Sequence, residues 1–155
     1  MKEFIKSVKI RLAEKSDWLF VLKLRNQKNV RQSSNDMSTI TIDDHVKYMI
    51  KLHNDLNSFH WIVMYDDIDV GYIKIINSEL SSFFLIEYTA KGIGTKSYEL
   101  MFLEARKLGL KKLFATVKIE RLTPLTFEEK LGWVKKKTLY KHNKPYGYLI
   151  EKILN

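Results

Sequence analysis

Tyr88-Thr89-Ala90-Lys91-Gly92-Ile93-Gly94-Thr95 marks the point where the hydrophobic pattern of this sequence changes its period. The apolar residues before it, over 82–88, have the pattern of a strand, and those at 93–108 recur at helical spacing. A turn with two glycines therefore joins a strand to a long amphipathic helix. The first amides of a helix lack partners within the helix, and the helix dipole makes that end positive. Because glycine lets a ligand approach the backbone closely, the turn is expected to bind an anion such as phosphate.

The turn fits neither of the common glycine-rich nucleotide motifs. Lys91 comes before the glycines, whereas the lysine of a P-loop follows them, and no third glycine completes a dinucleotide fingerprint. Lys91 and Lys96 add positive charge, and Thr95 adds a hydroxyl donor. Taken alone, two glycines here are more typical of a tight connection than of a ligand site. The rest of the chain must decide between these readings.

The remaining pattern predicts a mixed α/β sheet with helices packed on its faces. Helices are expected after Ser16, after a capping box at Thr41, from Ile93, and from near Pro124. The segment from 26 to 39 is polar and is interpreted as irregular, and 142–145 is interpreted as a loop. Strands are expected at 8–12, 59–65, 70–76, 82–88, 112–117, 133–140 and 146–153.

Length and composition are those of one globular domain spanning residues 1–155. The chain has 155 residues, 45% of them hydrophobic, and no cysteine. The absence of cysteine excludes disulfides, thiolate nucleophiles and cysteine-ligated zinc, and we expect no metal. No apolar run approaches the roughly 20 residues that cross a bilayer, and the N-terminus lacks the pattern of a secretion signal. We therefore expect a cytoplasmic protein without a membrane span.

The formal net charge of +9 has three interpretations: a lysine-rich surface, an anionic small ligand, or a nucleic acid. Lysines are spread along the chain, with a dense run at Lys135-Lys136-Lys137 followed by Lys141 and Lys144. No recognition-helix or RNA-binding signature accompanies them. We expect an anionic small molecule and no nucleic acid.

The segment around Gly92 resembles motif A of the GNAT superfamily of N-acetyltransferases, in which Q/R-x-x-G-x-G/A lies between a strand and a helix. Gly92 and Gly94 match the two glycine positions, while Thr89 stands at the Gln or Arg position and Ile86 where Pro is frequent. A second resemblance follows downstream. The register of the family's N-x-x-A-x-x-L-Y-x-K-x-G-F motif here contains Arg121, Pro124, Phe127, Glu128, Lys130, Gly132 and Trp133.

The resemblance covers residues 8 to 153 and implies the GNAT fold, a mostly antiparallel sheet of about seven strands with about four helices on its faces. It implies acetyl-CoA as co-substrate, with direct attack of an amine on the thioester and no covalent enzyme intermediate. A backbone amide near Phe84 or Leu85 would polarise the carbonyl. The residues expected to bind the cofactor are Phe84, Leu85, Ile86, Thr89, Lys91, Gly92, Ile93, Gly94, Thr95 and Arg121.

Three side chains are the expected catalytic candidates: Glu128, Glu79 and Tyr140. Glu128 stands at the position of the family's usual catalytic tyrosine, although it is also consistent with a solvated helix residue. Glu79 could act as a base through water, as could Glu87, but such glutamates are more often surface residues. Tyr140 could supply the missing phenol, as could Tyr146 and Tyr148, and each is also consistent with packing.

Arg25, Asn26, Arg31 and His45 are the expected substrate-binding residues. With Leu24 and Ser33 they resemble the branch of the superfamily that contains amino-sugar N-acetyltransferases of the pseudaminic-acid pathway type. Guanidinium groups suit a nucleotide-sugar diphosphate, although a salt-bridged helix end is equally consistent. The favoured acceptor is therefore the primary amine of a nucleotide-linked amino sugar. A protein N-terminal acetyltransferase and an idle acyl-CoA-binding module remain alternatives, and monomer and homodimer both stay open.

Overall fold

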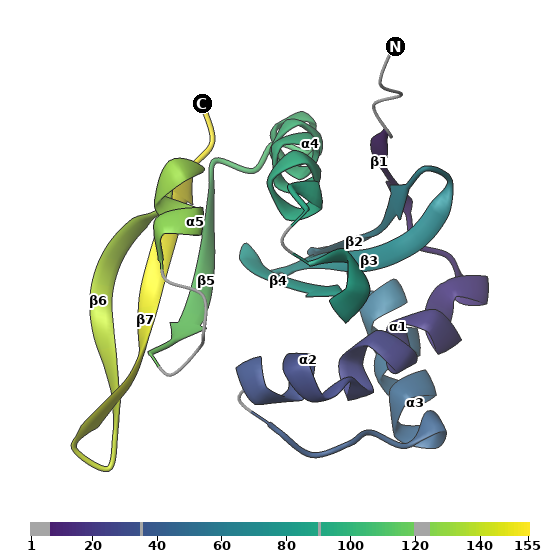
Figure 1. Ribbon diagram of the computed structural model, residues 1–155, viewed down its shortest axis with the longest axis horizontal. Helices are drawn as coiled ribbons and strands as arrows, with labels where there is room; N and C mark the ends of the chain where they lie inside the picture. Colours follow the sequence, from purple (N-terminus) through teal and green to yellow (C-terminus); the bar gives the residue numbers. More distant parts are fainter. Residues whose placement is uncertain (1–6, 35, 90, 120–124) are drawn as a thin grey trace.

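The computed structural model describes residues 7–34, 36–89, 91–119 and 125–155, and the statements below concern these residues. Seven strands form one sheet in the order β1-β2-β3-β4-β5-β7-β6 (Figure 1). The strands are β1 Val8–Leu12, β2 Ser58–Tyr65, β3 Ile68–Ile76, β4 Glu79–Phe84, β5 Lys112–Lys118, β6 Val134–Lys141 and β7 Lys144–Ile153. The β4–β5 pair is parallel and the other neighbours are antiparallel. The predicted mixed sheet is confirmed.

Helices cover both faces of the sheet (Figure 1). The α-helices are α1 Trp18–Asn26, α2 Lys28–Ser33, α3 Ile42–His53, α4 Ile93–Lys107 and α5 Thr126–Lys130, and short 3-10 turns occur at Lys15–Asp17 (η1) and Ile86–Tyr88 (η2). As the capping box predicted, Thr41 caps α3, because its hydroxyl accepts the Asp44 amide at 3.2 Å.

Besides the 142–145 loop described below, two of the predicted segments differ from the structure. The segment 26–39 is not irregular throughout, because α2 forms within it around the buried Val30, and this raises the helix count from the expected four to five among the described residues. A polar turn with one buried apolar residue gives almost no periodic signal. The strand expected at 82–88 begins earlier and ends at Phe84, after which the chain turns into η2, where the Tyr88 amide donates to Leu85 at 2.9 Å.

Tight turns fix the register of the antiparallel pairs. The β2–β3 turn at Asp66 and Asp67 has φ of 51° and 64°, and the β6–β7 turn at His142 and Asn143 has φ of 51° and 63°. Two consecutive positive φ values match the right-handed twist of the flanking strands. The predicted hairpin at Asp66–Asp67 is confirmed, whereas the expected 142–145 loop is a two-residue turn.

Alternating side chains of the sheet build two cores, one on each face. Trp61 and Val63 of β2 pack into the core under α4, together with Met101 and Phe102. Ile62, between them in the sequence, packs into the opposite core under α1 and α3. The functional consequence is that each strand can present residues to two separate chambers.

Arg11 on β1 and Asp17 in η1 form a paired contact at 2.8 Å and 2.8 Å between guanidinium and carboxylate. Chiefly this hydrogen bonding, opposed by burial, lowers the pKa of Asp17 below its usual value. A lowered pKa in the folded state stabilises the fold above the unfolded pKa, and that contribution is lost as the pH falls. We expect Asp17→Asn to lower the free energy of unfolding by about 1–3 kcal/mol at neutral pH, and the difference from the parent should shrink in acid.

Denaturant unfolding at pH 7 and at pH 3 measures this effect. Asp66→Asn is the matched control, because Asp66 is exposed in a turn with positive φ that asparagine also adopts. Equal stability of the Asp17→Asn and Asp66→Asn variants at pH 7 would contradict the role given to the Arg11–Asp17 pair.

Candidate active site

Strands β4 and β5 are joined at their start and then diverge, and we call this opening the fork (Figure 1). Their register contains a single bridge, Glu79 to Phe114, in the described part of the chain. The Phe114 amide donates to the Ser78 carbonyl at 2.8 Å beside that bridge. Parallel strands ordinarily pair along their length. The remainder of β4, toward Phe84, therefore has an edge that β5 does not cover.

The pairing of β4 with β3 decides which backbone groups face the fork. The Leu85 amide donates to the Val70 carbonyl at 2.8 Å, on the β3 side. Because successive amides of a strand point to opposite sides, the amides of Ser82 and Phe84 face the fork. Of the two amides expected to polarise a carbonyl, only that of Phe84 is suitably directed; Leu85 is excluded because it already has a partner.

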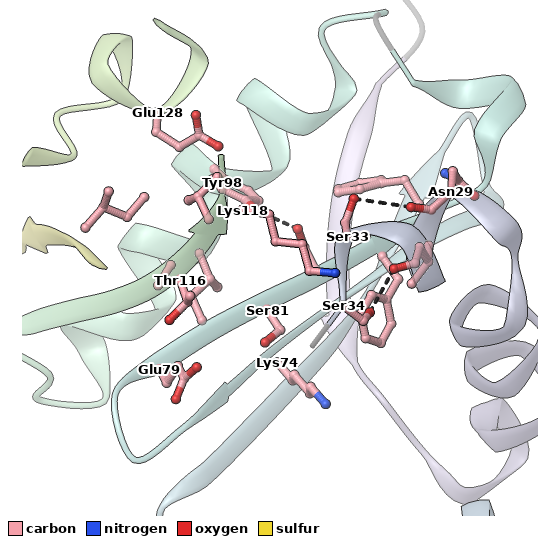
Figure 2. A pocket seen from close by; sticks show the side chains of 18 of the residues that line it. Asn29, Ser33, Ser34, Lys74, Glu79, Ser81, Tyr98, Thr116, Lys118 and Glu128 are labelled. Carbon is pink, nitrogen blue, oxygen red and sulfur yellow. Dashed lines mark hydrogen bonds between the residues drawn. The ribbon is translucent and has the colours of Figure 1, made fainter. Parts of the chain in front are cut away.

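A cavity of about 440 Å³ fills the fork and is lined from both faces of the sheet. Figure 2 shows Glu128 and Tyr98 at one end and Glu79, Ser81 and Lys74 at the other. The two groups lie on opposite faces of the sheet, because Ser82 of β4 meets Tyr98 on one face and the adjacent Ser81 lies opposite Lys74 on the other. The fork thus connects a chamber next to α4 with a chamber next to α1 and α2.

The chamber next to α4 contains a carboxylate and a phenol. Glu128 of α5 is 7% exposed and lines the cavity, so the interpretation of Glu128 as a solvated helix residue is wrong. The Tyr98 hydroxyl lies 2.6 Å from Ser82 Oγ and also lines the cavity. The Trp133 indole N–H is buried at the same place without a hydrogen-bond partner among the described residues. Proton donors and acceptors thus gather where β4 and β5 part.

The opposite chamber is lined by Glu79, by three cationic side chains and by the hydroxyls of Ser33 and Ser34 at the end of α2. Lys118 Nζ donates to the Gln32 carbonyl at 3.1 Å, which ties β5 to the end of α2. Lys74 Nζ lies 2.9 Å from Tyr48 Oη. A second cavity of about 200 Å³ adjoins the first, since Arg25, Lys74 and Phe83 line both.

The turn before α4 has the geometry expected of an anion site. Gly92 is the N-cap with φ of 77°, a left-handed conformation that glycine adopts without strain. The Lys96 amide donates to the Gly92 carbonyl at 3.2 Å as the first helical bond, so the amides of Ile93, Gly94 and Thr95 precede the helical ladder. Thr89 lines the large cavity and so links this turn to the fork.

Two of the expected substrate residues serve the main chain instead. Asn26 donates to the Ile40 carbonyl at 2.9 Å and accepts its amide at 2.8 Å. Arg31 donates to the Asn26 carbonyl at 3.1 Å and to Met37 at 3.4 Å. Backbone groups in irregular chain must find partners. Neither residue lines either of the two cavities, so the structure gives no support to the expectation that they contact substrate, which stays a prediction.

Arg25 and His45 do reach the cavities. Arg25 lines both, although it also donates to the Asp36 carbonyl at 2.6 Å. His45 lines the small cavity with Nε2 2.7 Å from the Trp18 carbonyl. Its burial lowers the pKa of His45, which keeps the ring neutral.

Tyr140, one of the three expected catalytic residues, lies away from the cavity in the structure. It lies on β6, the edge strand outside β7, and is 66% exposed. Two strands' width separates it from the fork. The lining of the cavity does not include seven of the expected cofactor residues: Leu85, Ile86, Lys91, Gly92, Ile93, Gly94 and Thr95. Arg121 lies outside the described residues.

Gln27 is a site residue that the sequence did not indicate. Its side-chain amide donates to the Phe84 carbonyl at 2.9 Å and its oxygen accepts the Ile86 amide at 3.3 Å. It therefore takes the place of a neighbouring strand at the end of β4. Tyr98 and Lys74 were also missed; their apolar parts fit a helix stripe and a strand, and only the fold brings their polar ends to a cavity.

Comparison with known proteins identifies the fold. No protein-family profile and no curated protein matches the sequence, but solved structures match it over nearly its whole length. A spermidine N-acetyltransferase from Vibrio cholerae, in complex with CoA and spermine, superposes with a TM-score of 0.83 at 16% identity and covers 95% of each chain. The chain has the GNAT fold.

Two further structures agree. An acetyltransferase of the GNAT family from Streptococcus pneumoniae matches with a TM-score of 0.75 at 18% identity, covering 96% of this chain and 100% of that one. An N-acetyltransferase from Staphylococcus aureus Mu50 matches with a TM-score of 0.76 at 18% identity, covering 96% and 99%. The GNAT fold that the two sequence motifs implied is therefore confirmed, including the mostly antiparallel sheet.

No group of three His, Asp or Glu side chains among the described residues could hold a metal ion. No helix in the described part of the chain has the length and apolar character needed to cross a membrane. The cytoplasmic location stays a prediction.

Proposed function

We propose that this chain is an N-acetyltransferase that moves the acetyl group of acetyl-CoA to a primary amine. The observation that carries the proposal is the fork: an uncovered edge of β4, with the Phe84 amide directed into a cavity of about 440 Å³, next to the free amides that begin α4. Structures of the same fold that are named acetyltransferases, one of them in complex with CoA, support it.

The residues present fit acetyl-CoA. Lys91, Gly92, Ile93, Gly94 and Thr95 would hold the pyrophosphate through backbone amides and one lysine. The pantetheine arm would take the edge of β4 at Ser82 and at the Phe84 amide, which β5 does not cover, whereas the Phe84 carbonyl already accepts a hydrogen bond from Gln27. Acetyl-CoA supplies an activated thioester, and the protein supplies position and proton transfer.

The two chambers divide the proton transfers. Glu79, in the chamber next to α1 and α2, would take the proton from the attacking amine, and the Phe84 amide would stabilise charge on the carbonyl oxygen. The new C–N bond forms as the C–S bond breaks. Tyr98 or Glu128, in the chamber next to α4, would give a proton to the departing sulfur.

The variant Tyr98→Phe distinguishes between Tyr98 and Glu128 as the donor of this proton. We expect it to lower kcat by about 10- to 100-fold, because the phenol is lost without a change of shape, and Tyr140→Phe to leave kcat unchanged, because Tyr140 is outside the cavity. Steady-state release of free thiol measures both. Full kcat in Tyr98→Phe, with a large loss in Glu128→Gln, would assign the proton donor to Glu128.

For the acceptor, the resemblance at residues 24–45 favours a nucleotide-linked amino sugar. Of the residues that carry it, Arg25 and His45 support the proposal by lining the cavities, whereas Asn26 and Arg31 no longer do. The test is thiol release from acetyl-CoA with three kinds of amine: a uridine-diphosphate amino sugar, a peptide with a free N-terminus, and spermidine. Turnover with the peptide alone would favour an N-terminal acetyltransferase. If calorimetry shows that the protein binds CoA but no amine causes release of thiol, the chain is a catalytically idle acyl-CoA-binding module.

A further inference from the structure

Lys74 stands at the junction of the two cavities and lines both. It lies on β3 directly opposite Ser81 of β4, so its side chain emerges on the same face as Ser81 and Glu79. Its Nζ is 2.9 Å from Tyr48 Oη and 5.0 Å from the centre of that ring. These contacts place the ammonium group between the fork and the smaller cavity.

Three cationic side chains, those of Arg25, Lys74 and Lys118, line this chamber with one carboxylate, that of Glu79, so its positive charge exceeds its negative charge. Among the described residues no Asp or Glu forms an ion pair with Lys74, Arg25 or Lys118. Arg25 and Lys118 instead donate to main-chain carbonyls of Asp36 and Gln32. Cations gathered in a concave site with low-dielectric walls attract an anion and oppose a second cation.

The Lys74 ammonium group also has more hydrogen-bond donors than it uses within the described chain. An ammonium group has three N–H donors, and Tyr48 is its hydrogen-bond partner within the described chain. The small cavity of about 200 Å³ has room beside it for a carboxylate or a phosphate group. Tyr48 and His45, which also line this cavity, add a hydroxyl and a neutral ring.

We propose that Lys74, with Tyr48 and Arg25, binds an anionic group on the acceptor, so that the acceptor is a small primary amine that carries a carboxylate or a phosphate. This rests on the proposed acetyl transfer and names the substrate class for it. Residues two apart on a strand are about 7 Å apart, and Glu79 is two residues from Ser81, which faces Lys74. The amine at Glu79 and the anion at Lys74 are thus separated by the length of a compact molecule.

Matched pairs of amines test the substrate class with the parent protein. Each pair differs in the anionic group: glucosamine 6-phosphate against glucosamine, L-alanine against L-alanine amide, and a uridine-diphosphate amino sugar against the free amino sugar. We expect a higher kcat/KM for the anionic member of at least one pair and the lowest value for spermidine. The pair that responds distinguishes a carboxylate, a phosphate monoester and a nucleotide diphosphate as the source of the anion.

Variants of Lys74 then assign the effect to this residue. Lys74→Met should raise KM for the preferred anionic amine about tenfold with little change in kcat, since a charge-assisted bond to a substrate is lost. Lys74→Arg should keep the KM for that amine close to the value of the parent protein. Lys74→Glu should raise the rate with spermidine relative to the rate with the anionic amine. Lys9→Glu is the matched charge control, because Lys9 is exposed on β1 and outside both cavities. Thermal unfolding checks that each variant folds.

The outcomes separate this proposal from the one on which it rests. Preference for spermidine or for the uncharged member of every pair would overturn the anionic acceptor and leave acetyl transfer standing. An unchanged KM in Lys74→Met would overturn the role of Lys74. If no amine causes release of thiol, the proposed acetyl transfer is wrong, and the role given to Lys74 is wrong with it.

Discussion

Gly92→Asp is expected to weaken CoA binding about a hundredfold while the protein remains folded. Gly92 has φ of 77°, and a Cβ at this position would meet nothing within 4 Å. Aspartate is among the residues that tolerate this left-handed conformation, and a negative charge at the start of a helix is favourable. The same charge would repel a pyrophosphate and compete for the amides that bind it. The expected loss corresponds to about 2.7 kcal/mol.

Two variants make this result specific. Gly92→Asn has nearly the shape of Gly92→Asp without its charge, so it should lose much less affinity. Gly109→Asp places the same charge at the other end of α4, at a glycine with φ of 86° and no atom within 4 Å of an added Cβ, and should bind CoA as the parent does. Calorimetric titration with CoA measures all three. If Gly92→Asp has the same dissociation constant for CoA as the parent protein, the turn does not bind the pyrophosphate, and the proposed function loses its main support.

Glu79→Gln is expected to lower kcat/KM for the amine by about 100- to 10,000-fold, the range for loss of a general base. Glu79 opens β4 at the single bridge to Phe114 and lines the cavity in the chamber assigned to the acceptor. Glutamine preserves the shape and removes the proton acceptor. The rate of the variant should rise with pH, because a larger fraction of the free amine is then deprotonated without help, whereas CoA affinity should not change.

Initial rates across a pH series, with CoA binding measured in parallel, test this prediction. Glu129→Gln is the control, since Glu129 is exposed on α5 and does not line the cavity. A Glu79→Gln variant as active as Glu129→Gln would show that the amine loses its proton to water or to another group.

The chemistry of the site could be predicted only in part, because its residues come from distant strands and helices. Glu79 and Glu128 were identified from their neighbours in the sequence, and both line the cavity. Tyr140 was placed on a strand correctly, but the strand order β5-β7-β6 puts that strand at the edge of the sheet. No local pattern reveals strand order, since it depends on which edges pair after the chain has folded.

The chamber next to α1 and α2 also shows how little of the site could be predicted from the sequence. Arg31 and Asn26 were chosen for their functional groups, yet the carbonyls and amide of the segment before α3 bind those groups. Lys74 and Tyr98 were overlooked, although one meets Tyr48 and the other Ser82 across the fold. A polar side chain shows its role only when its partners, far away in the sequence, are known.

What the sequence by itself determined is the local machinery: the strand, the two-glycine turn and the long helix, whose free amides follow from a change of hydrophobic period and the conformational freedom of Gly92. What only the tertiary structure decided is the fork, because a single bridge between Glu79 and Phe114 joins two strands far apart in the chain. That divergence leaves the Phe84 amide without a partner from β5 and opens a cavity beside it, which Glu79 and Tyr98 line from opposite faces of the sheet. Unlike the outer edges of β1 and β6, this uncovered edge of β4 lies within the sheet and faces a cavity, so it is where a ligand can add its own bonds.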